Sequence, residues 1–289
     1  MGLFSMNEAE WWDRFGTLNN RVWEYDPYIN SVIRSEYLTE MQKFLYKPGG
    51  KLLDFGCGTG WFSMPFALQG MTVDAIDNSA EQILRGKELA LKYNAAGIIF
   101  TFDTDIPSVQ NHYDAVLLHA LIHHIPIHDR INLLEKVQRV LTPEGRLYIY
   151  EPIFQQANPP PPALVADLVM GGIFRLMRYL ARYAHLYAPD IRAAIQDGWT
   201  MRSPTEQPGT LDQLKRLLPA EMSLVSVQAW HIWSINYANF CMMLRPNWRK
   251  LFKRGLPAFY KLDRWARGKT WSPYLRCWPC VSLKAQKKG

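Results

Sequence analysis

The pattern best suited to chemistry in this chain is an acidic residue followed by three alternating glycines. It runs from Asp54 through Gly56 and Gly58 to Gly60, directly after the apolar pair Leu52-Leu53. Glycine lets a backbone adopt positive φ and approach a ligand closely, because no Cβ stands in the way. A helix that starts after such a loop offers unpaired N–H groups and a partial positive charge. The stretch therefore predicts a strand, a tight loop and a helix that hold a nucleotide-type ligand.

The spacing of these glycines argues against a dinucleotide. The dinucleotide fingerprint needs a third glycine that lets helix and strand pack closely, and Trp61 occupies that position. The spacing D-x-G-x-G-x-G instead resembles motif I of the class I S-adenosylmethionine-dependent methyltransferases. The resemblance implies S-adenosyl-L-methionine as the cofactor. The loop residues that it assigns to the cofactor are Asp54, Gly56, Cys57, Gly58 and Gly60.

Acidic residues at two further strand ends extend the predicted cofactor site. Asp77, followed by Asn78, ends the second expected strand, where a carboxylate can accept hydrogen bonds from both ribose hydroxyls. Asp103 and Thr104 follow the third strand, where members of the family often hold the adenine amino group. The family's usual spacing there has one more residue, so Asp105 could replace Asp103. The alternative for each Asp is a turn former or a helix cap.

Histidines gather after the fourth expected strand, within residues 118–126. This segment resembles the family's L-H-H-L stretch, which implies that His119 lies near the cofactor and that His123 or His124 lies nearer the substrate. Glu151 begins an E-P pair that in similar enzymes often faces the substrate pocket. Because imidazole titrates near neutrality, His123 and His124 are candidate bases beside Glu151; a histidine held by backbone groups is the alternative. We expect no metal, since adjacent histidines rarely converge on one ion and no Cys, Asp or Glu follows at ligand spacing.

Strand-like and helix-like segments alternate through the middle of the chain, which predicts a parallel sheet with crossover helices. The expected strands are 51–55, 72–76, 98–102, 113–120 and 146–150, and the expected helices are 61–69, 80–93 and 129–141. The resemblance implies that strands within 221–235 and 278–286 close the sheet as an antiparallel pair. The expected fold class is α/β: a three-layer, doubly wound, mostly parallel seven-stranded sheet with an antiparallel last strand, a helical N-terminal cap and helical insertions.

We expect four segments within one domain. They are a helical cap (1–47), the S-adenosylmethionine-binding core (48–155), a lid over the substrate (156–220), and the C-terminal strands with a basic aromatic insertion (221–289). In the cap, Tyr25 begins a Tyr-Asp-Pro-Tyr stretch similar to a region that covers the methionine end of the cofactor in the family; plain helix packing is the alternative. The lid is expected to start with a stiff linker, Asn158–Pro162, and to contain a long helix over Leu164–Tyr187 and a short one over Leu211–Leu218.

Positive charge is concentrated at the C-terminal end. The 289 residues include 33 Lys+Arg and 26 Asp+Glu, but residues 241–289 alone hold 13 Lys or Arg and a single Asp. Within residues 245–271, Trp and Phe alternate with Lys and Arg, which is typical of helices that lie on an anionic membrane surface. One alternative is that the aromatic side chains cover a sheet edge and the charges are solvated. Nucleic acid is a weaker alternative, because no RNA-binding module is recognisable.

The remaining features of the sequence predict where in the cell the protein is located. No run of 18 uncharged apolar residues predicts a spanning helix, and the N-terminus lacks the basic start and apolar run of a signal peptide. Four cysteines are too few for a disulfide scaffold. The C-x-x-C from Cys277 to Cys280 lacks the second pair of a zinc site, so we treat it as incidental. The expectation is a cytoplasmic protein that is peripheral at the inner face of a membrane if the basic segment docks there.

Together the resemblance and the C-terminal charge predict a function. The chain is expected to be an S-adenosylmethionine-dependent methyltransferase that acts on a small or lipid-linked apolar acceptor through O, N or C. An RNA methyltransferase is one alternative. A non-catalytic S-adenosylmethionine-binding subunit that activates a partner enzyme is another.

Overall fold

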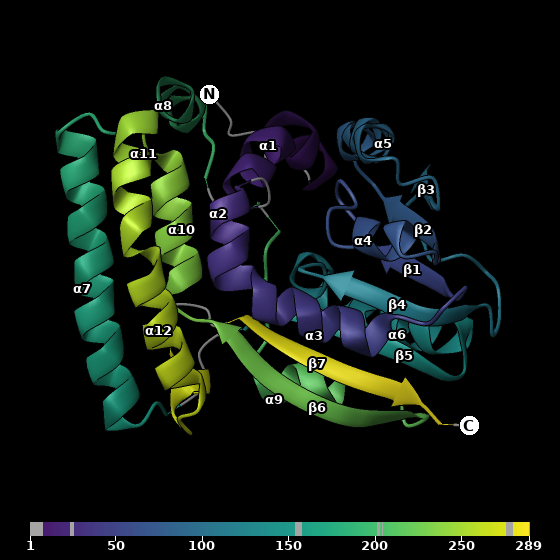
Figure 1. The fold of residues 1–289 in the computed structure, drawn as a ribbon. Coiled ribbons are helices and arrows are strands. Elements are labelled where there is room, and N and C mark those ends of the chain that lie inside the picture. Colours follow the sequence, from purple (N-terminus) through teal and green to yellow (C-terminus); the bar gives the residue numbers. More distant parts are fainter. Residues whose placement is uncertain are drawn as a thin grey trace.

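A seven-stranded sheet forms the centre of the computed structural model, which describes residues 8–23, 26–153, 158–200, 203, 205–275 and 280–288 (Figure 1). The strand order is β3-β2-β1-β4-β5-β7-β6. Strands β1 to β5 pair in parallel, and β7 lies antiparallel between β5 and β6. The strands are β1 (Lys51–Phe55), β2 (Thr72–Asp77), β3 (Ile98–Phe102), β4 (Tyr113–His119), β5 (Leu141–Pro152), β6 (Met222–His231) and β7 (Cys280–Lys287). The predicted doubly wound α/β fold is confirmed.

Successive residues of the central strands pack on opposite faces of the sheet, because side chains alternate along a strand. Leu52 belongs to the hydrophobic core on one face and Leu53 to the core on the other. In β4, Leu117 and Leu118 divide in the same way. Both faces are therefore covered, and such strands are apolar throughout rather than at every second residue.

Helices on both faces complete the three layers. The helices α3 (Ser35–Leu45), α4 (Met64–Leu68) and α5 (Ala80–Tyr93) pack on one face, and α6 (Arg130–Val140) and α9 (Leu211–Arg216) pack on the other. The Ser79 hydroxyl accepts a hydrogen bond from Gln82 N–H and so caps α5, whose end is marked by Asn94 at φ +55°. Helix α5 has the bounds expected from the sequence.

The N-terminal segment is helical, as expected. It comprises α1 (Glu8–Trp23), α2 (Pro27–Ile29) and a π-helical turn (Asn30–Arg34) that runs into α3. A carboxylate oxygen of Asp26 accepts a hydrogen bond from Ile29 N–H at 3.0 Å and caps the second of these helices. Tyr25, which the sequence assigned to the cofactor, lies outside the described residues, as does Cys277.

A second body of helices stands beside the sheet and has its own hydrophobic core (Figure 1). The helices that join α1 there are α7 (Pro161–Tyr183), α8 (Pro189–Gln196), α10 (Ser234–Met243), α11 (Pro246–Phe252) and α12 (Leu256–Arg267). Helix α10 is buried on all sides. At the start of α10, the N–H groups of Trp233 and Ser234 donate hydrogen bonds to the carboxylate of Asp263 in α12. Among the described residues, none of the helices combines the length and the apolar character needed to cross a bilayer.

Several boundaries expected from the sequence were wrong. The helix expected over 61–69 is only α4, because residues 61–63 form turns. Strand β5 begins at Leu141, opposite Tyr113, and runs through the predicted turn at 142–145, where Glu144 has φ +62°. Pairing resumes at Arg146 opposite Ala115, so the predicted turn is an irregularity within the strand.

In the C-terminal half of the chain, the observed elements differ more from those expected from the sequence. Helix α7 starts at Pro161, inside the expected linker, because proline suits the first turn of a helix. The strand expected over 221–235 ends at His231, and the residues after it begin α10. Strands β6 and β7 pair antiparallel as expected, but α10, α11 and α12 lie between them in the chain.

Candidate functional site

A cavity of about 1130 Å³ opens at the carboxyl ends of β1, β2 and β4. Doubly wound sheets bind their ligands at this edge, where the strand order reverses, here between β1 and β4. The sequence-predicted residues that line the cavity are Asp54, Gly56, Cys57, Gly58, Asp77, Asn78, Asp103, Thr104, His119, His123 and His124. Gly60 and Glu151 are not among the lining residues.

The three glycines of the loop all have positive φ, but a Cβ at each would meet different surroundings. A Cβ on Gly56 would lie 2.5 Å from the Leu121 side chain, and one on Gly60 would lie 2.7 Å from the Phe100 ring. A Cβ on Gly58 would meet only the Gln82 side chain, at 3.8 Å. The open side of Gly58 faces the cavity, so a flat ligand can approach the backbone there. The loop therefore fits an adenosyl group lying against it.

Asp77 holds the glycine loop in place. Its two carboxylate oxygens accept hydrogen bonds from Gly58 N–H at 2.7 Å and from Ser79 N–H at 2.9 Å. Burial raises the pKa of Asp77, although these N–H donors oppose the shift. A carboxylate has about four acceptor positions, so each oxygen can accept one further donor from the cavity.

Of the two carboxylates after β3, one lines the cavity. Asp103 lies in the lining and accepts hydrogen bonds from Thr104 N–H at 2.6 Å and Asp105 N–H at 3.2 Å. Asp105 instead forms an ion pair with Lys136 at 2.6 Å, and this pair lowers the pKa of Asp105. Of these two carboxylates, Asp103 is therefore the one placed to contact a ligand.

His119 lies between two aromatic rings. Its ring stacks on Phe62 at a centroid distance of 3.6 Å and on Tyr150 at 4.6 Å. Burial holds the pKa of His119 well below its usual range, so the ring is neutral. Its Nε2 is buried and has no hydrogen-bond partner among the described residues, which leaves one polar atom of this ring available at the cavity.

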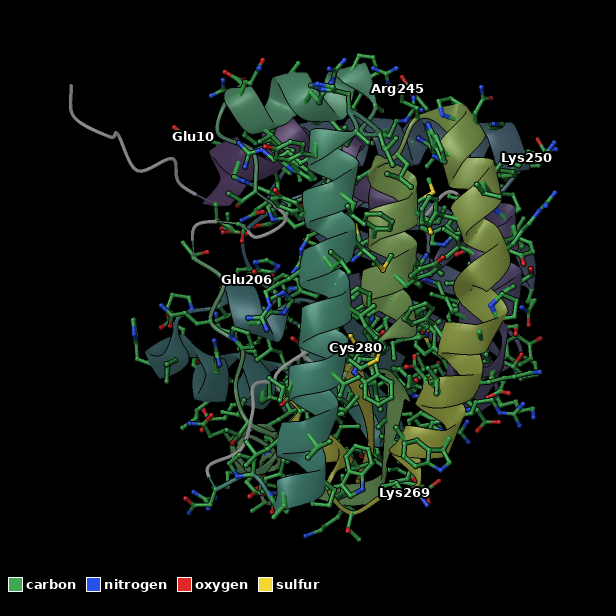
Figure 2. The ribbon with its side chains drawn as sticks, turned by 90° about the vertical axis from the view of Figure 1, so that its left-hand side faces the viewer. Glu10, Glu206, Arg245, Lys250, Lys269 and Cys280 are labelled. Carbon is green, nitrogen blue, oxygen red and sulfur yellow. The ribbon has the colours of Figure 1, made fainter. Side chains whose placement is uncertain are left out.

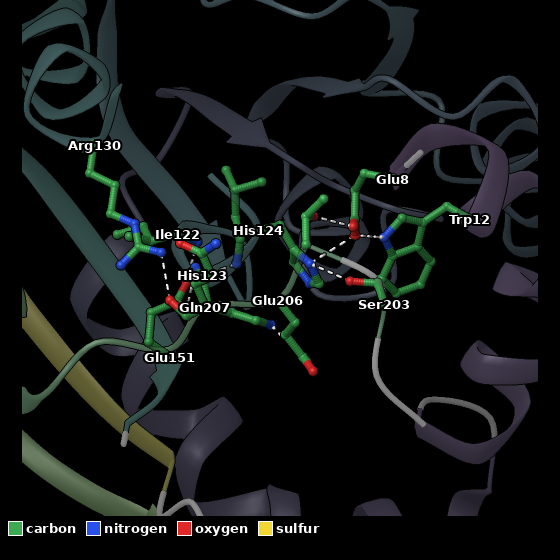
Figure 3. A network of polar contacts seen from close by, with 12 residues as sticks. Glu8, Trp12, Ile122, His123, His124, Arg130, Glu151, Ser203, Glu206 and Gln207 are labelled. Atoms are coloured by element: carbon green, nitrogen blue, oxygen red, sulfur yellow. Dashed lines mark hydrogen bonds and ion pairs between the residues drawn. The ribbon is translucent and has the colours of Figure 1, made fainter. Parts of the chain in front are cut away.

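Glu151 organises the turn after β4 (Figure 3). Its carboxylate accepts hydrogen bonds from Leu121 N–H at 2.8 Å and Ile122 N–H at 2.6 Å, and His123 Nδ1 lies 2.6 Å from its second oxygen. His123 Nε2 faces Glu206 Oε1 at 3.4 Å. Burial opposes protonation of the ring, but the charges of Glu151 and Glu206 raise the pKa of His123 to about 9. The partners of this histidine are carboxylates rather than backbone groups.

His124 is held from the opposite side. Its Nδ1 lies 2.8 Å from Glu8 Oε1 and 3.0 Å from Ser203 Oγ. Burial and the neighbouring His123 lower the pKa of His124. Burial raises the pKa of Glu8, but hydrogen bonds from His124, Thr205 and Ser203 outweigh it and lower that pKa to about 2. The N-terminal helix and the segment after α8 thus meet over this histidine.

The segment that carries Glu206 is fixed to the same turn. Gln207 N–H donates to the His123 carbonyl at 2.6 Å. Arg130 donates to the carbonyls of Ile125 and Gln207 at 2.8 and 2.5 Å. Two stretches that are far apart in the sequence are therefore held together at the mouth of the cavity.

Other residues that line the cavity were not found from the sequence. They are Glu8, Trp11, Trp12, Arg34, Tyr37, Ser203, Glu206, and the α7 residues Leu168, Met170, Phe174, Arg175 and Arg178. Trp11 and Trp12 were expected only as part of the helical N-terminal cap. Nothing in the spacing of Glu206 pointed to the turn after β4, because the fold alone brings these segments together.

Comparison with known proteins supports the interpretation of the loop. The methyltransferase domain family matches residues 52–145. The chain is 26% identical over 213 residues to a ubiquinone biosynthesis O-methyltransferase of Sodalis glossinidius, covering 71% of this chain and 76% of that protein. It is 30% identical over 151 residues to cycloartenol-C-24-methyltransferase 1 of Oryza sativa, covering 51% of this chain and 42% of that protein.

Solved structures show the same fold. The [4+2]-cyclase SpnF matches with a TM-score of 0.62 and 15% identity, covering 98% of this chain and 96% of that one. Geranyl diphosphate C-methyltransferase of Streptomyces coelicolor, solved with S-adenosyl-L-homocysteine, matches with a TM-score of 0.54 and 13% identity, covering 88% and 79%. At these identities the likeness concerns the fold alone, and a shared fold does not fix a reaction.

Proposed function

This chain belongs to the class I S-adenosylmethionine-dependent methyltransferases, and we propose that it methylates a small or lipid-type apolar acceptor. Bound S-adenosyl-L-methionine supplies the activated methyl group on its sulfonium. The protein has to align an acceptor O, N or C with that methyl and exclude water. The single observation that carries the proposal is the size and lining of the cavity.

We assign the glycine-loop end of the cavity to the cofactor. Asp77 would accept the ribose hydroxyls with the acceptor positions that Gly58 and Ser79 leave unused. Asp103 and Thr104 would contact the adenine. The buried carboxylate of Asp54 would support the loop at the methionine end. The remaining residues assigned to the cofactor are Gly56, Cys57, Gly60, Asn78, His119 and Tyr25.

The opposite end of the cavity suits an apolar acceptor. A single drug-sized ligand fills roughly 300–1,000 Å³, so about 1130 Å³ allows two reactants side by side. Apart from the glycine-loop residues, the cavity lining includes Leu168, Met170 and Phe174 of α7 together with Trp11 and Trp12 of α1. The relatives named for ubiquinone and cycloartenol methylation act in the chemistry of apolar, lipid-type molecules, which agrees with such a lining.

Bases are available if the acceptor carries a proton. His124 is neutral and borders the cavity, so its ring can accept a proton from an acceptor hydroxyl or amine. His123 borders the cavity as well, but its raised pKa keeps it protonated near neutral pH. Glu151, which is not among the lining residues, would orient His123 rather than contact the acceptor.

We further propose that the protein works at an anionic membrane surface. Along α7 a stripe of apolar side chains faces solvent, including Val165 at 61% and Tyr183 at 73% exposure. Trp248 and Trp265 are exposed on the basic segment 245–271. In Figure 2, α7 and the basic helices lie side by side on one face, with Lys250 and Lys269 near its edge. Exposed apolar patches beside basic residues are typical of membrane-binding surfaces.

A radiolabel experiment tests the proposed reaction. Purified protein is incubated with methyl-labelled S-adenosyl-L-methionine and with either the lipid fraction or the RNA fraction of host cells. We expect label in an organic-soluble product identified by mass, and none with the Asp77→Ala variant. Label in RNA would favour the RNA methyltransferase instead. Label that appears only when a second protein is added would favour an activating subunit.

A further inference from the structure

Two histidines and a carboxylate converge where the cavity meets the turn after β4. One ring nitrogen of His123, one of His124 and one carboxylate oxygen of Glu206 lie within 4.8 Å of one another. The histidines are neighbours in sequence, and the glutamate comes from the distant segment tied down by Gln207 and Arg130 (Figure 3). The expectation of no metal assumed that no companion ligand exists, and Glu206 supplies one that spacing could not reveal.

The geometry around His123 is that of a metal ligand. Its Nδ1 lies 2.6 Å from Glu151, so Nε2 is the nitrogen that can bind an ion once it has released its proton. That Nε2 lies 3.4 Å from Glu206 Oε1. Two ligands bonded to a tetrahedral ion at about 2.0–2.1 Å lie about 3.3–3.4 Å apart. An ion between these two atoms would therefore need little rearrangement of either side chain.

His124 is anchored in the same manner. Its Nδ1 contacts Glu8 at 2.8 Å and Ser203 at 3.0 Å, so Nε2 is the nitrogen left for an ion. A histidine that binds a metal almost always donates its other ring N–H to a carboxylate or carbonyl. Both histidines of this pair have a carboxylate in that position, Glu151 for one and Glu8 for the other.

A further observation points to a missing partner. Glu206 Oε2 is buried and has no hydrogen-bond partner among the described residues. An unpartnered buried carboxylate oxygen is costly, because it has lost its water without gaining a donor or a cation. His123, His124 and Glu206 all line the cavity, so an ion held by them would keep a coordination position open toward a ligand there.

We propose that His123, His124 and Glu206 bind one divalent transition-metal ion, with Zn²⁺ as the best match to two imidazoles and one carboxylate. Mg²⁺ and Ca²⁺ prefer all-oxygen sites, so they match this ligand set less well. Two histidines and a glutamate with an open fourth position are the ligands of catalytic zinc sites. The inference goes beyond the proposed function and does not depend on it; in the zinc-bound chain His124 would be a ligand and not a base.

Zinc titration of the full chain, without an added histidine tag and after removal of metals with a chelator, tests the site. We expect one Zn²⁺ per chain by calorimetry, and visible absorption typical of a tetrahedral site when Co²⁺ is used. Glu206→Gln and His124→Asn should each weaken Zn²⁺ binding by at least 100-fold. Glu8→Gln should weaken it by 10–100-fold, since it removes the carboxylate behind a ligand.

His128→Asn is the matched control, because this neighbouring histidine is exposed and its Nε2 lies 3.4 Å from Asp129. It should leave Zn²⁺ affinity unchanged. Circular dichroism and the heat of S-adenosyl-L-homocysteine binding report whether each variant is folded and keep this test separate from that of the methyltransferase. No stoichiometric Zn²⁺ or Co²⁺ binding by the parent chain would overturn the proposal. Equal loss in His128→Asn, or full binding by both Glu206→Gln and His124→Asn, would overturn it as well.

Discussion

The carboxylates at the two ends of the cavity differ in the groups that contact them. Asp77, at the cofactor end, accepts hydrogen bonds from two backbone N–H groups and keeps acceptor positions for a ligand. At the other end, Glu151 and Glu8 each face a histidine ring, and Glu206 lies 3.4 Å from the Nε2 atom of His123. Single substitutions at the two ends should therefore have separable effects on cofactor binding and on the acceptor side.

Asp77→Ala should weaken cofactor binding strongly. The variant removes the two charge-assisted hydrogen bonds that we propose to the ribose and also frees Gly58 N–H, and hydrogen bonds to charged groups contribute about 1.5–3 kcal/mol each. We expect affinity for S-adenosyl-L-homocysteine to fall by at least about 100-fold in calorimetry. Asp105→Ala should bind like the parent chain, since that carboxylate pairs with Lys136 outside the cavity. Equal affinities for the parent and Asp77→Ala would contradict the ribose assignment.

Gly56→Ala and Gly58→Ala should separate stability from binding. Both positions have positive φ, which costs roughly 1–2 kcal/mol for a residue with a Cβ. Only Gly56→Ala also drives its Cβ into Leu121, and overpacking adds about 1–3 kcal/mol. In urea unfolding Gly56→Ala should be the less stable variant, whereas Gly58→Ala should lose cofactor affinity through the methyl group that enters the cavity. The reverse order of stability would argue against the described loop geometry.

At the scale of elements, the strands and helices around the sheet could be predicted and the helical body largely could not. Strands β1 to β4 are short, largely apolar runs that end in Asp or His or are followed at once by Gly or Asp, a local signal that needs no knowledge of distant contacts. Helix α10 is buried on all sides, so it lacks the apolar stripe that identifies a surface helix. The site divides in the same way: the glycine loop and Asp77 follow from local pattern, whereas Glu206 reaches the cavity only through tertiary packing.

One junction between elements has a clear pH dependence. His231, at the end of β6, donates from Nε2 to the Ile33 carbonyl at 2.7 Å, and its Nδ1 lies 2.5 Å from the Tyr150 hydroxyl. Burial disfavours the charged ring and lowers the pKa of His231 to about 3. Since the pKa is lower in the folded chain, this neutral histidine contributes stability above pH 6.5 that is lost as pH falls toward 3.

His231→Gln should remove that dependence, because glutamine can donate to Ile33 and does not titrate. Between pH 7.5 and pH 5 the free energy of unfolding of the parent chain should fall by about 2 kcal/mol more than that of the variant. Urea unfolding at the two pH values measures this difference. Parallel losses in both chains would mean that the ring accepts its proton without cost, contrary to its burial.

At the scale of the whole molecule, the cavity and the exposed apolar stripe share one helix. The inner side of α7 contributes Met170 and Phe174 to the cavity lining, and its outer side presents Val165, Leu176 and Tyr183 to solvent. Helix α12 packs beside it through Phe174 and Phe259, whose ring centroids lie 5.8 Å apart. A bilayer that covers this face would bring an apolar acceptor to the helix that borders the cavity.

Replacing the stripe should detach the protein from membranes. The triple variant Val165→Ser, Leu176→Ser and Leu180→Ser removes three exposed apolar side chains that do not line the cavity, and should reduce sedimentation with vesicles containing anionic phospholipid by at least 10-fold. Lys250→Gln with Arg254→Gln and Arg264→Gln should reduce it mainly at low salt, because each charge near an anionic surface contributes about 1 kcal/mol and salt screens it.

Leu91→Ser is the control for the stripe, since Leu91 is 81% exposed on α5, away from this face. It should sediment with vesicles like the parent chain. If the triple variant also sediments like the parent, the membrane does not contact α7. If the parent chain is a dimer by light scattering and the triple variant a monomer without any change in vesicle binding, the stripe is covered by a second copy of the chain. Neither outcome would alter the cofactor end of the cavity, which lies at the sheet and not on the outer face of this helix.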